Sequence, residues 1–270
     1  MPLPTNHLKA ALAANLPQIG IWLSLASPYS SELLADVGFD WLLIDAEHGP
    51  NDIPTILAQA QTIGAHTSVV VRPPVGEAWM IKQILDLGVQ TLMVPMIESV
   101  DQAKTVIAAT LYPPHGVRGV GAASARASNF GRLTDYVKTA NDQVCLILQV
   151  ESRAGLAALP GILQLENVDC VFVGPADLAA DMGFPGESSA PAVQSAIDGA
   201  LLQIVASGKA AGILTFDRAG AEHYMKLGVT FVGVGSDVAL LAHAASNLAA
   251  DIKGLTAGGQ VPRVWPHGQK

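Results

Sequence analysis

The segment of residues 42–50, LLIDAEHGP, begins as an apolar strand and then places Asp45, Glu47 and His48 within four positions. Burying an ionisable group costs several kcal/mol unless the group is paired or solvated. We therefore expect the buried strand to end here, where its polar residues face a site. Because histidine titrates near neutral pH, His48 is a candidate general base, and an ordinary polar loop residue is the alternative.

Two more carboxylates follow apolar runs: Glu151 follows LILQV, and Asp177 follows VFVGPA. Two carboxylates at adjacent strand ends leave most coordination positions to water and substrate, which suits Mg²⁺, Mn²⁺ or Co²⁺. The alternatives are a first-turn acid for Glu151 and a helix N-cap for Asp177. Taken together, the pair indicates a metal site. Asp181, one helical turn further on, is interpreted as a solvated helix residue.

Other residues near strand ends fit the binding of a small molecule. Gly174 permits close backbone approach, and the amides of Ala176 and Asp177 are expected to point outward at a helix N-terminus, where a carboxylate binds. Trp22 and Leu214, at the ends of the first and seventh predicted strands, can line a pocket but are core residues by default.

Arg72 and Asp86 each allow two interpretations. Arg72 lies directly after VVV and before two prolines, and a buried arginine requires an anion, either a structural carboxylate or a substrate oxyanion. Asp86 lies in the last turn of a predicted helix, where an acid is mildly unfavourable. It either pairs with Lys82, one turn earlier, or orients His48 as its partner carboxylate. Spacing alone does not decide between these two.

The elements that must position these residues alternate along the chain. Short β-branched strands are each followed by a helical pattern, which predicts a single (β/α)₈ barrel with its catalytic groups at the carboxyl ends of the strands. A doubly wound open sheet is the alternative, but no GxGxxG follows the first strand. The predicted strands span residues 18–24, 39–45, 67–72, 90–95, 144–151, 170–174, 210–215 and 230–235.

Length and composition agree with one such domain. The chain has 270 residues, of which 50 % are hydrophobic and 14 % charged, and no composition shift marks a linker. We expect a single domain over residues 1–270, with the barrel core at about 17–254 and a C-terminal extension at 255–270. The segment 112–133 is too long for a plain connector. Neither its role nor that of the extension follows from the sequence.

The net charge of −8 argues against a nucleic-acid footprint or a polybasic membrane contact. No stretch approaches the ~20 apolar residues of a membrane span, and the N-terminal residues lack a signal-peptide h-region, so we expect a cytoplasmic protein. Cys145 and Cys170 lie in apolar runs without CxxC spacing. This favours two buried small side chains over a disulfide or a metal pair.

At these residues the sequence resembles the metal-dependent, pyruvate-specific class II aldolases typified by 4-hydroxy-2-oxoheptanedioate aldolase. The matching stretches run in consistent order from about residue 8 to about residue 250 and include GFDWLLIDAEHGP, VVVRP, IKQILDLG, LILQVES and VFVGPADLAADMG. The resemblance implies a (β/α)₈ aldolase that uses Mg²⁺, Mn²⁺ or Co²⁺ and no organic cofactor. It also implies a place in the catabolism of aromatic compounds.

The resemblance further assigns roles to single residues. His48 would be the base, Asp86 would raise its basicity, and Arg72 would stabilise an enolate. The implied substrate contacts are Gln149, Ala176 and Asp177, and the implied metal ligands are Glu151 and Asp177. The family forms homohexamers, as trimers of dimers, with the last helix exchanged between neighbours. The long loop that carries Arg126 would lie near such an interface.

The expected reaction is reversible retro-aldol cleavage of a 4-hydroxy-2-oxo acid, such as 4-hydroxy-2-oxoheptanedioate, to pyruvate and an aldehyde, such as succinate semialdehyde. The metal and Arg72 hold the pyruvate enolate, His48 removes the C4 hydroxyl proton, and Asp45 and Glu47 hydrogen-bond the waters of the metal. A Schiff-base aldolase is disfavoured because no predicted strand carries a lysine. The alternatives are a 2-keto-3-deoxy sugar-acid or hydroxypyruvate aldolase, a phosphoenolpyruvate mutase-type lyase, and a non-catalytic 2-oxo acid sensor.

Overall fold

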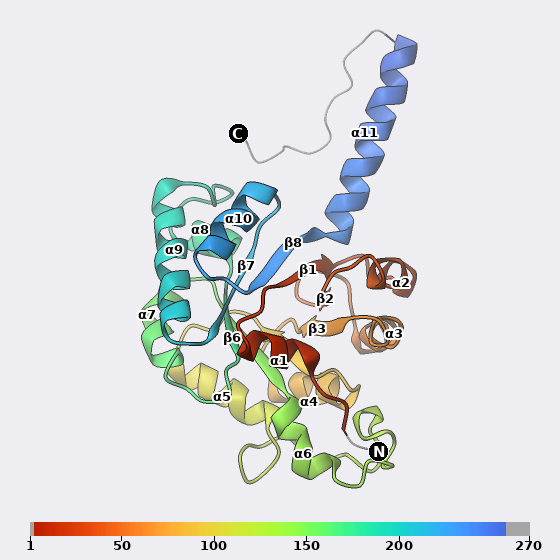
Figure 1. Cartoon of the computed structure of the whole chain (residues 1–270), viewed down its shortest axis with the longest axis vertical. Coiled ribbons are helices and arrows are strands. Elements are labelled where there is room, and N and C mark those ends of the chain that lie inside the picture. The colour runs from red at the N-terminus through yellow and green to blue at the C-terminus, as the bar shows by residue number, and fades with distance from the viewer. Residues whose placement is uncertain (1–2, 258–270) are drawn as a thin grey trace.

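The computed structural model describes residues 3–257, in which eight parallel strands close into a barrel in sequence order (Figure 1). Each strand pairs with the next, and β8 closes the barrel against β1. All eight predicted strands are present, so the (β/α)₈ barrel is confirmed and the doubly wound alternative is excluded. The strands are β1 (Gln18–Leu23), β2 (Trp41–Asp45), β3 (Ser68–Arg72), β4 (Thr91–Val94), β5 (Cys145–Val150), β6 (Cys170–Val173), β7 (Ala210–Leu214) and β8 (Phe231–Ser236).

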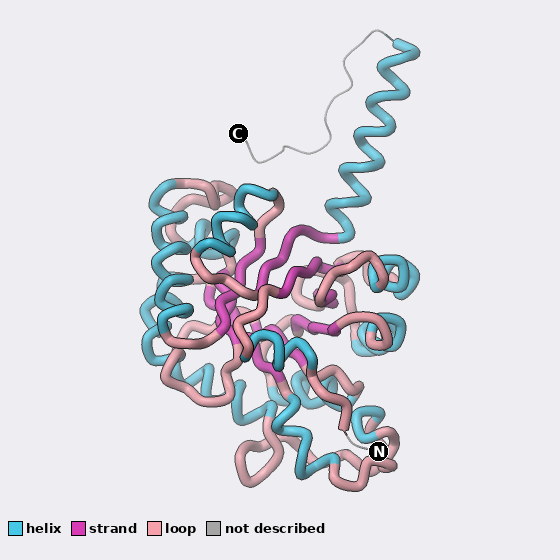
Figure 2. The backbone as a smooth tube through the Cα atoms, viewed as in Figure 1, coloured by secondary structure: helices cyan, strands magenta, loops and turns pink. Residues whose placement is uncertain are grey.

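Helices surround the barrel (Figure 2). Side-chain caps define where several of them begin. Ser27, Asp52, Ser99, Ser152 and Asp217 each accept a hydrogen bond from a first-turn backbone N–H that has no partner within its helix. The described helices are α1 (His7–Ala13), α2 (Pro28–Ala35), α3 (Ile53–Ile63), α4 (Ala78–Asp86), α5 (Val100–Thr110), η1 (Arg126–Ser128), α6 (Tyr136–Gln143), α7 (Arg153–Ile162), α8 (Pro175–Asp181), α9 (Pro191–Ala206), α10 (Arg218–Lys226) and α11 (Asp237–Ala257). The sequence patterns do not predict α1 and α6, because each has at most eight residues and buries only two side chains.

The interior of the barrel forms a core of its own, separate from the layer between strands and helices. Trp41 stacks on Phe231 with ring centroids 4.1 Å apart, and Trp22 meets Trp41 edge-on at 5.5 Å. Helix α1 lies across the amino end of the barrel, and its buried Leu8 and Leu12 join this inner cluster. The amino end of the barrel is filled with apolar side chains. Functional polar residues are therefore expected at the carboxyl end of the strands.

The two cysteines belong to the same inner cluster. Both are free and fully buried, as expected from their apolar surroundings. Burial raises the pKa of each thiol well above its usual value, so neither is a reactive thiolate at neutral pH.

Helix α11 leaves the barrel at its first residue and extends away from it (Figure 1). The buried carboxylate of Asp237 holds this exit, since it accepts hydrogen bonds from the backbone N–H of Ser24 at 2.8 Å and of Leu25 at 3.2 Å. Large apolar side chains further along the helix are exposed: Leu240, Leu241, Leu248 and Ile252. The predicted extension starts within the last turn of α11, and residues 258–270 lie outside the described part of the chain. Across residues 3–257, no helix combines the length and the apolar character needed to span a membrane.

We expect the contact between α1 and the barrel interior to contribute to stability. Leu8→Ala removes a fully buried side chain and should lower the free energy of unfolding by about 2–5 kcal/mol. Leu16→Ala is the matched control, because Leu16 is 54 % exposed and its loss should change stability by at most about 0.5 kcal/mol. Urea unfolding followed by circular dichroism measures both, and equal effects would contradict a packed amino end.

Candidate active site

Four buried polar side chains lie at the carboxyl ends of β2, β3 and β5: Asp45, Arg72, Gln149 and Glu151. Asp45 is the last residue of β2 and lies opposite Arg72, the last residue of β3, in the parallel register. Glu151 directly follows β5. Closure of the barrel therefore brings together residues that the sequence analysis selected separately.

Arg72 makes most of the polar contacts in this site. Its Nε and Nη2 lie 2.9 and 2.8 Å from the two oxygens of Asp45, and its Nη1 lies 2.8 Å from Glu47 Oε2 and 3.5 Å from Gln149 Oε1. Asp45 also accepts the backbone N–H of Glu47 at 3.1 Å and of His48 at 3.4 Å. Both oxygens of Asp45 are thus used within the protein. Asp45 holds Arg72 and the following turn, and its expected hydrogen bond to a water of the metal stays a prediction.

The carboxylate of Glu47 has fewer hydrogen-bond partners than that of Asp45. Its Oε2 atom is buried and accepts no hydrogen bond from the described residues, although Arg72 Nη1 is close. Burial raises the pKa of Glu47 to about 7, Arg72 opposes this rise, and the charge of Glu151 adds to it. Apart from the Arg72 ion pair this oxygen has no partner among the described residues, so it can accept a hydrogen bond from a bound water, and that role of Glu47 stays a prediction.

His48 is open to solvent. Its side chain is 66 % exposed, and Nε2 lies 3.8 Å from Glu47 Oε2. The backbone of the 45–48 turn is held by Asp45, so the imidazole is carried on a fixed support. An accessible imidazole beside a buried charge cluster is suited to proton transfer with a bound molecule.

Glu151 is held on both of its oxygens. Oε1 accepts the backbone N–H of Met96 at 2.9 Å, and Oε2 accepts a hydrogen bond from the side-chain amide of Gln149. Burial raises the pKa of Glu151, these two hydrogen bonds oppose the rise, and the nearby charge of Asp177 adds to it. Asp177 is exposed in the first turn of α8, so an open carboxylate lies near the buried one of Glu151.

The two structural alternatives for these acids are wrong. Helix α7 begins at Arg153 with Ser152 as its N-cap, so Glu151 precedes the helix and is not an acid in its first turn. Gly174 is the N-cap residue of α8, and Asp177 lies inside the helix. Neither carboxylate is therefore used to cap a helix.

The donor set fits a divalent cation. Within residues 3–257, no three His, Cys, Asp or Glu side chains form a group that could hold a metal. Glu151 and Asp177 are the candidate carboxylate ligands, and water and substrate would have to supply the remaining oxygen ligands. Gly174 makes room for this site, because a Cβ built on it would lie 2.7 Å from Glu151 Cβ and closer still to Oε2. Its φ of −85° suits any residue, so space alone requires glycine.

Apolar side chains lie beneath the polar cluster. The Arg72 guanidinium lies 6.0 Å from the centroid of the Trp22 ring, and Trp22 meets Phe172 at 5.7 Å. Leu214 packs against the same inner cluster, and a Cβ on Gly233 would contact both Trp22 and Leu214. The structure thus brings Trp22 and Leu214 together as part of the core beneath the site.

Asp86 lies elsewhere in the molecule. It is the last residue of α4, which leads back to the amino end of β4, whereas His48 follows the carboxyl end of β2. Arg118 Nη2 lies 2.7 Å from Asp86 Oδ1, and the Arg118 guanidinium lies 4.3 Å from the centroid of the Tyr112 ring. Among the described residues Asp86 pairs with neither His48 nor Lys82, since the segment 112–133 supplies its partner.

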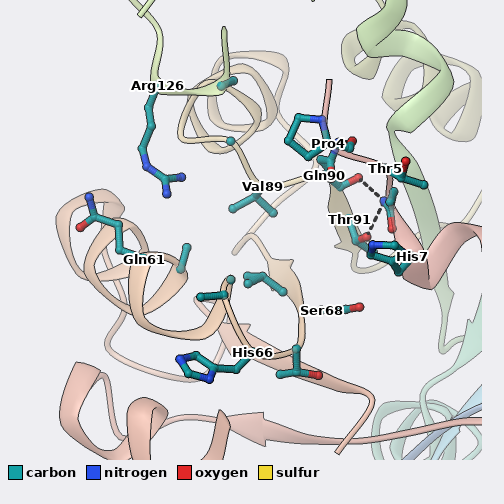
Figure 3. Close-up of a pocket in the computed structure, with 18 of the residues that line it drawn as sticks. Pro4, Thr5, His7, Gln61, His66, Ser68, Val89, Gln90, Thr91 and Arg126 are labelled. Atoms are coloured by element: carbon teal, nitrogen blue, oxygen red, sulfur yellow. Dashed lines mark hydrogen bonds between the residues drawn. The ribbon is translucent and has the colours of Figure 1, made fainter. Parts of the chain in front are cut away.

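A large hollow of about 1220 Å³ also lies at the amino end of the barrel, away from the carboxylates (Figure 3). Arg126 and His66 border it together with residues at the starts of strands, such as Gln18 and Ser68. It contains none of the candidate catalytic residues or metal ligands, and the candidate active site is therefore not this hollow.

Sequence reasoning missed two contacts of the site. Met96 donates its backbone N–H to Glu151 from a left-handed conformation with φ of 55°, and no side-chain pattern signals such a contact. Asp181 is an exposed residue of α8, as expected, and its carboxylate also binds Arg153, a contact that the sequence did not predict. The spacing of Asp177 and Asp181, one turn apart on one helix, was the available signal.

Fold and site together define a (β/α)₈ enzyme with paired carboxylates at the carboxyl ends of its strands. Residues 18–244 match the HpcH/HpaI aldolase/citrate lyase family, and the chain belongs to this family. It is therefore a carbon–carbon lyase of the aldolase type, and members of the family generally depend on a divalent metal.

Several proteins of this family are similar to the chain over nearly its whole length. A hydroxypyruvate/pyruvate aldolase of Deinococcus radiodurans is 55 % identical over 92 % of this chain and 90 % of its own. A 4-hydroxy-2-oxo-heptane-1,7-dioate aldolase of Escherichia coli is 54 % identical over 91 % of this chain and 94 % of its own. The crystal structure of an HpcH/HpaI aldolase/citrate lyase family protein from Burkholderia cenocepacia superimposes with a TM-score of 0.89 at 40 % identity, over 92 % of this chain and all of that one.

The space beside Glu151 leads to a prediction about Gly174. Gly174→Ala places a methyl group against the Glu151 side chain, and we expect it to weaken Mn²⁺ binding about tenfold or more. Gly199→Ala in α9 is the control, since a Cβ there meets no atom within 4 Å, and its Mn²⁺ affinity should be unchanged. Titration calorimetry measures both, and undiminished binding by Gly174→Ala would show that Glu151 is not confined as described.

Proposed function

We propose that this chain catalyses the reversible retro-aldol cleavage of 4-hydroxy-2-oxo acids to pyruvate and an aldehyde. The observation that carries the proposal is the convergence of Glu151, Asp177 and Arg72 at one end of the barrel, beside an accessible His48. Two relatives, 55 % and 54 % identical to this chain, are named hydroxypyruvate/pyruvate aldolase and 4-hydroxy-2-oxo-heptane-1,7-dioate aldolase, which supports the same reaction.

A divalent ion held by Glu151 and Asp177 would act as a Lewis acid on the 2-oxo acid and stabilise negative charge on its keto oxygen. The buried Oε2 of Glu47 accepts no hydrogen bond from the described residues, and Gly174 leaves space beside Glu151. Both features favour Glu151 and Asp177 as the ligands. Mg²⁺, Mn²⁺ and Co²⁺ all suit two carboxylates completed by oxygen ligands.

Side chains of the protein have separate roles in the other steps of the reaction. Arg72, fixed by two hydrogen bonds to Asp45, directs positive charge toward the oxygen of the developing enolate. Gln149 and the backbone at Ala176 and Asp177 orient the 2-oxo acid. His48 takes the proton of the C4 hydroxyl as the C3–C4 bond breaks, and the enolate then gains a proton at C3 to give pyruvate.

The apolar side chains beneath the site provide a dry floor for the substrate. We assign Trp22 and Leu214 to the wall that contacts the C3 methylene, which becomes the methyl group of pyruvate. Gly174 lies beside Glu151 and has no side chain, so the substrate can approach the backbone at this position.

Assembly is part of the proposal. Asp86 lies at the opposite end of its own barrel from His48, so an Asp86 carboxylate that raises the basicity of His48 has to come from a second copy. The exposed apolar side chains of α11, which extends away from the barrel, favour exchange of this helix between copies. We therefore propose a single-domain subunit in a homohexamer, built as a trimer of dimers.

Hydroxypyruvate is a second candidate donor. The relatives from Deinococcus radiodurans and Agrobacterium fabrum, 55 % and 51 % identical to this chain, are both named hydroxypyruvate/pyruvate aldolases. The same keto acid contacts serve both donors, because hydroxypyruvate differs from pyruvate only by a hydroxyl group at C3.

Metal removal and a substrate screen test the proposed reaction. After treatment with a chelator, release of pyruvate from 4-hydroxy-2-oxoheptanedioate should cease, and Mn²⁺, Co²⁺ or Mg²⁺ should restore it. None of the eight strands carries a lysine, so borohydride with pyruvate should leave no covalent adduct in the mass spectrum. An adduct, or full activity in the chelator, would refute the metal-dependent reaction.

Single variants separate the base from the enolate-stabilising residue. His48→Ala should reduce cleavage by about 10²–10⁴-fold and leave Mn²⁺ affinity unchanged. Arg72→Ala should also abolish exchange of the pyruvate C3 protons in deuterated water, measured by proton NMR. The control variants are His66→Ala and Arg218→Ala, whose side chains lie outside the site and pair with Asp36 and Glu222. Unaltered exchange in Arg72→Ala would exclude its role with the enolate.

A further inference from the structure

The short helix α8 carries two acids, Asp177 and Asp181, on one face. Residues four apart in an α-helix are neighbours on its surface, one turn apart. The segment that follows β5 presents Glu151 and, two residues later, Arg153, the first residue of α7. Val150 pairs with Val173 across β5 and β6, so Glu151 lies beside Gly174, the N-cap residue of α8, and Asp181 contacts Arg153. The same face of α8 thus lies along the 151–153 segment.

The contact between Asp181 and Arg153 includes the main chain. Asp181 Oδ2 accepts the backbone N–H of Arg153 at 2.7 Å and its side-chain Nε at 3.0 Å. The first N–H groups of a helix have no partner within it, and Asp181 satisfies one of them at the start of α7. A bond to the backbone of residue 153 fixes the chain only two residues after Glu151.

This contact has little to contribute to the stability of the whole domain. The side chains of Arg153 and Asp181 are 71 % and 37 % exposed, and exposed ion pairs stabilise proteins weakly. The contact matters because of its position: it joins the segment that carries Glu151 to the helix that carries Asp177.

We propose that Asp181 is a positioning residue for the metal site, which sets the separation of Glu151 and Asp177 by tying the end of α8 to the backbone of Arg153. The inference rests on the proposed assignment of Glu151 and Asp177 as metal ligands. A carboxylate that orients ligands without binding the metal typically changes metal affinity about 10–100-fold when removed.

Three variants of the full chain test the role of the backbone contact. Asp181→Ala removes both hydrogen bonds and should weaken Mn²⁺ binding about tenfold, as measured by titration calorimetry and by the electron paramagnetic resonance of free Mn²⁺. Asp181→Asn retains an acceptor oxygen and should recover most of the affinity. Arg153→Ala removes the side-chain bond but retains the backbone N–H, and its affinity should stay within about twofold of the parent. The urea midpoint should be the same in all three.

Two further variants distinguish failure of this inference from failure of the proposed site. Glu151→Gln and Asp177→Asn should each abolish Mn²⁺ binding. Parental affinity in Asp181→Ala, with both of these variants unable to bind, would overturn the positioning role and leave the metal site in place. Parental affinity in Glu151→Gln and Asp177→Asn would overturn the site itself. Equal losses in Asp181→Ala and Arg153→Ala would overturn the backbone contact as the cause.

Discussion

An excess of negative charge at the carboxyl end of the barrel constrains the rest of this site. Asp45 and Glu47 pair with the buried Arg72, and Glu151 and Asp177 add two more carboxylates near them. Both oxygens of Asp45 are bound to Arg72, so the other carboxylates are incompletely neutralised. Burial accordingly raises the pKa values of Glu47 and Glu151. A divalent cation bound by Glu151 and Asp177, as proposed, would relieve the same excess and so connect the fold to the proposed chemistry.

The barrel meets this constraint by separating apolar and polar packing along its axis. Aromatic rings of Trp41 and Phe231 fill the interior, and Leu8 of α1 occupies the amino end. The charged residues then lie above a rigid apolar floor at the other end. Such a floor limits the movement of Arg72 and Glu151, so their geometry is set before a substrate arrives.

The proposed assembly would explain several exposed features of the chain. Helix α11 extends from the barrel with apolar side chains exposed, and the buried Asp237 holds its first residue against the backbone after β1. Asp86 is held by Arg118 on the long segment between α5 and α6, at the amino end of the barrel. A subunit of this shape leaves surfaces and one expected catalytic acid for contacts with a second copy.

The sequence by itself determined the eight strands and the residues that end them. Runs of β-branched and apolar residues specify strands buried on both faces, and acids directly after such runs mark the point where burial stops. Asp45, Arg72, Gln149 and Glu151 could be selected on this basis, because each is near a strand end and the barrel brings all strand ends to one side.

Only the tertiary structure decided which charged groups pair. Asp86 pairs with Arg118, although the sequence offered Lys82 or His48, and the exposed Asp181 pairs with Arg153, for which the sequence suggested no partner. These contacts join segments 28 or more positions apart. Their geometry depends on where a loop or a short helix packs on the barrel, and local periodicity carries no information about that packing.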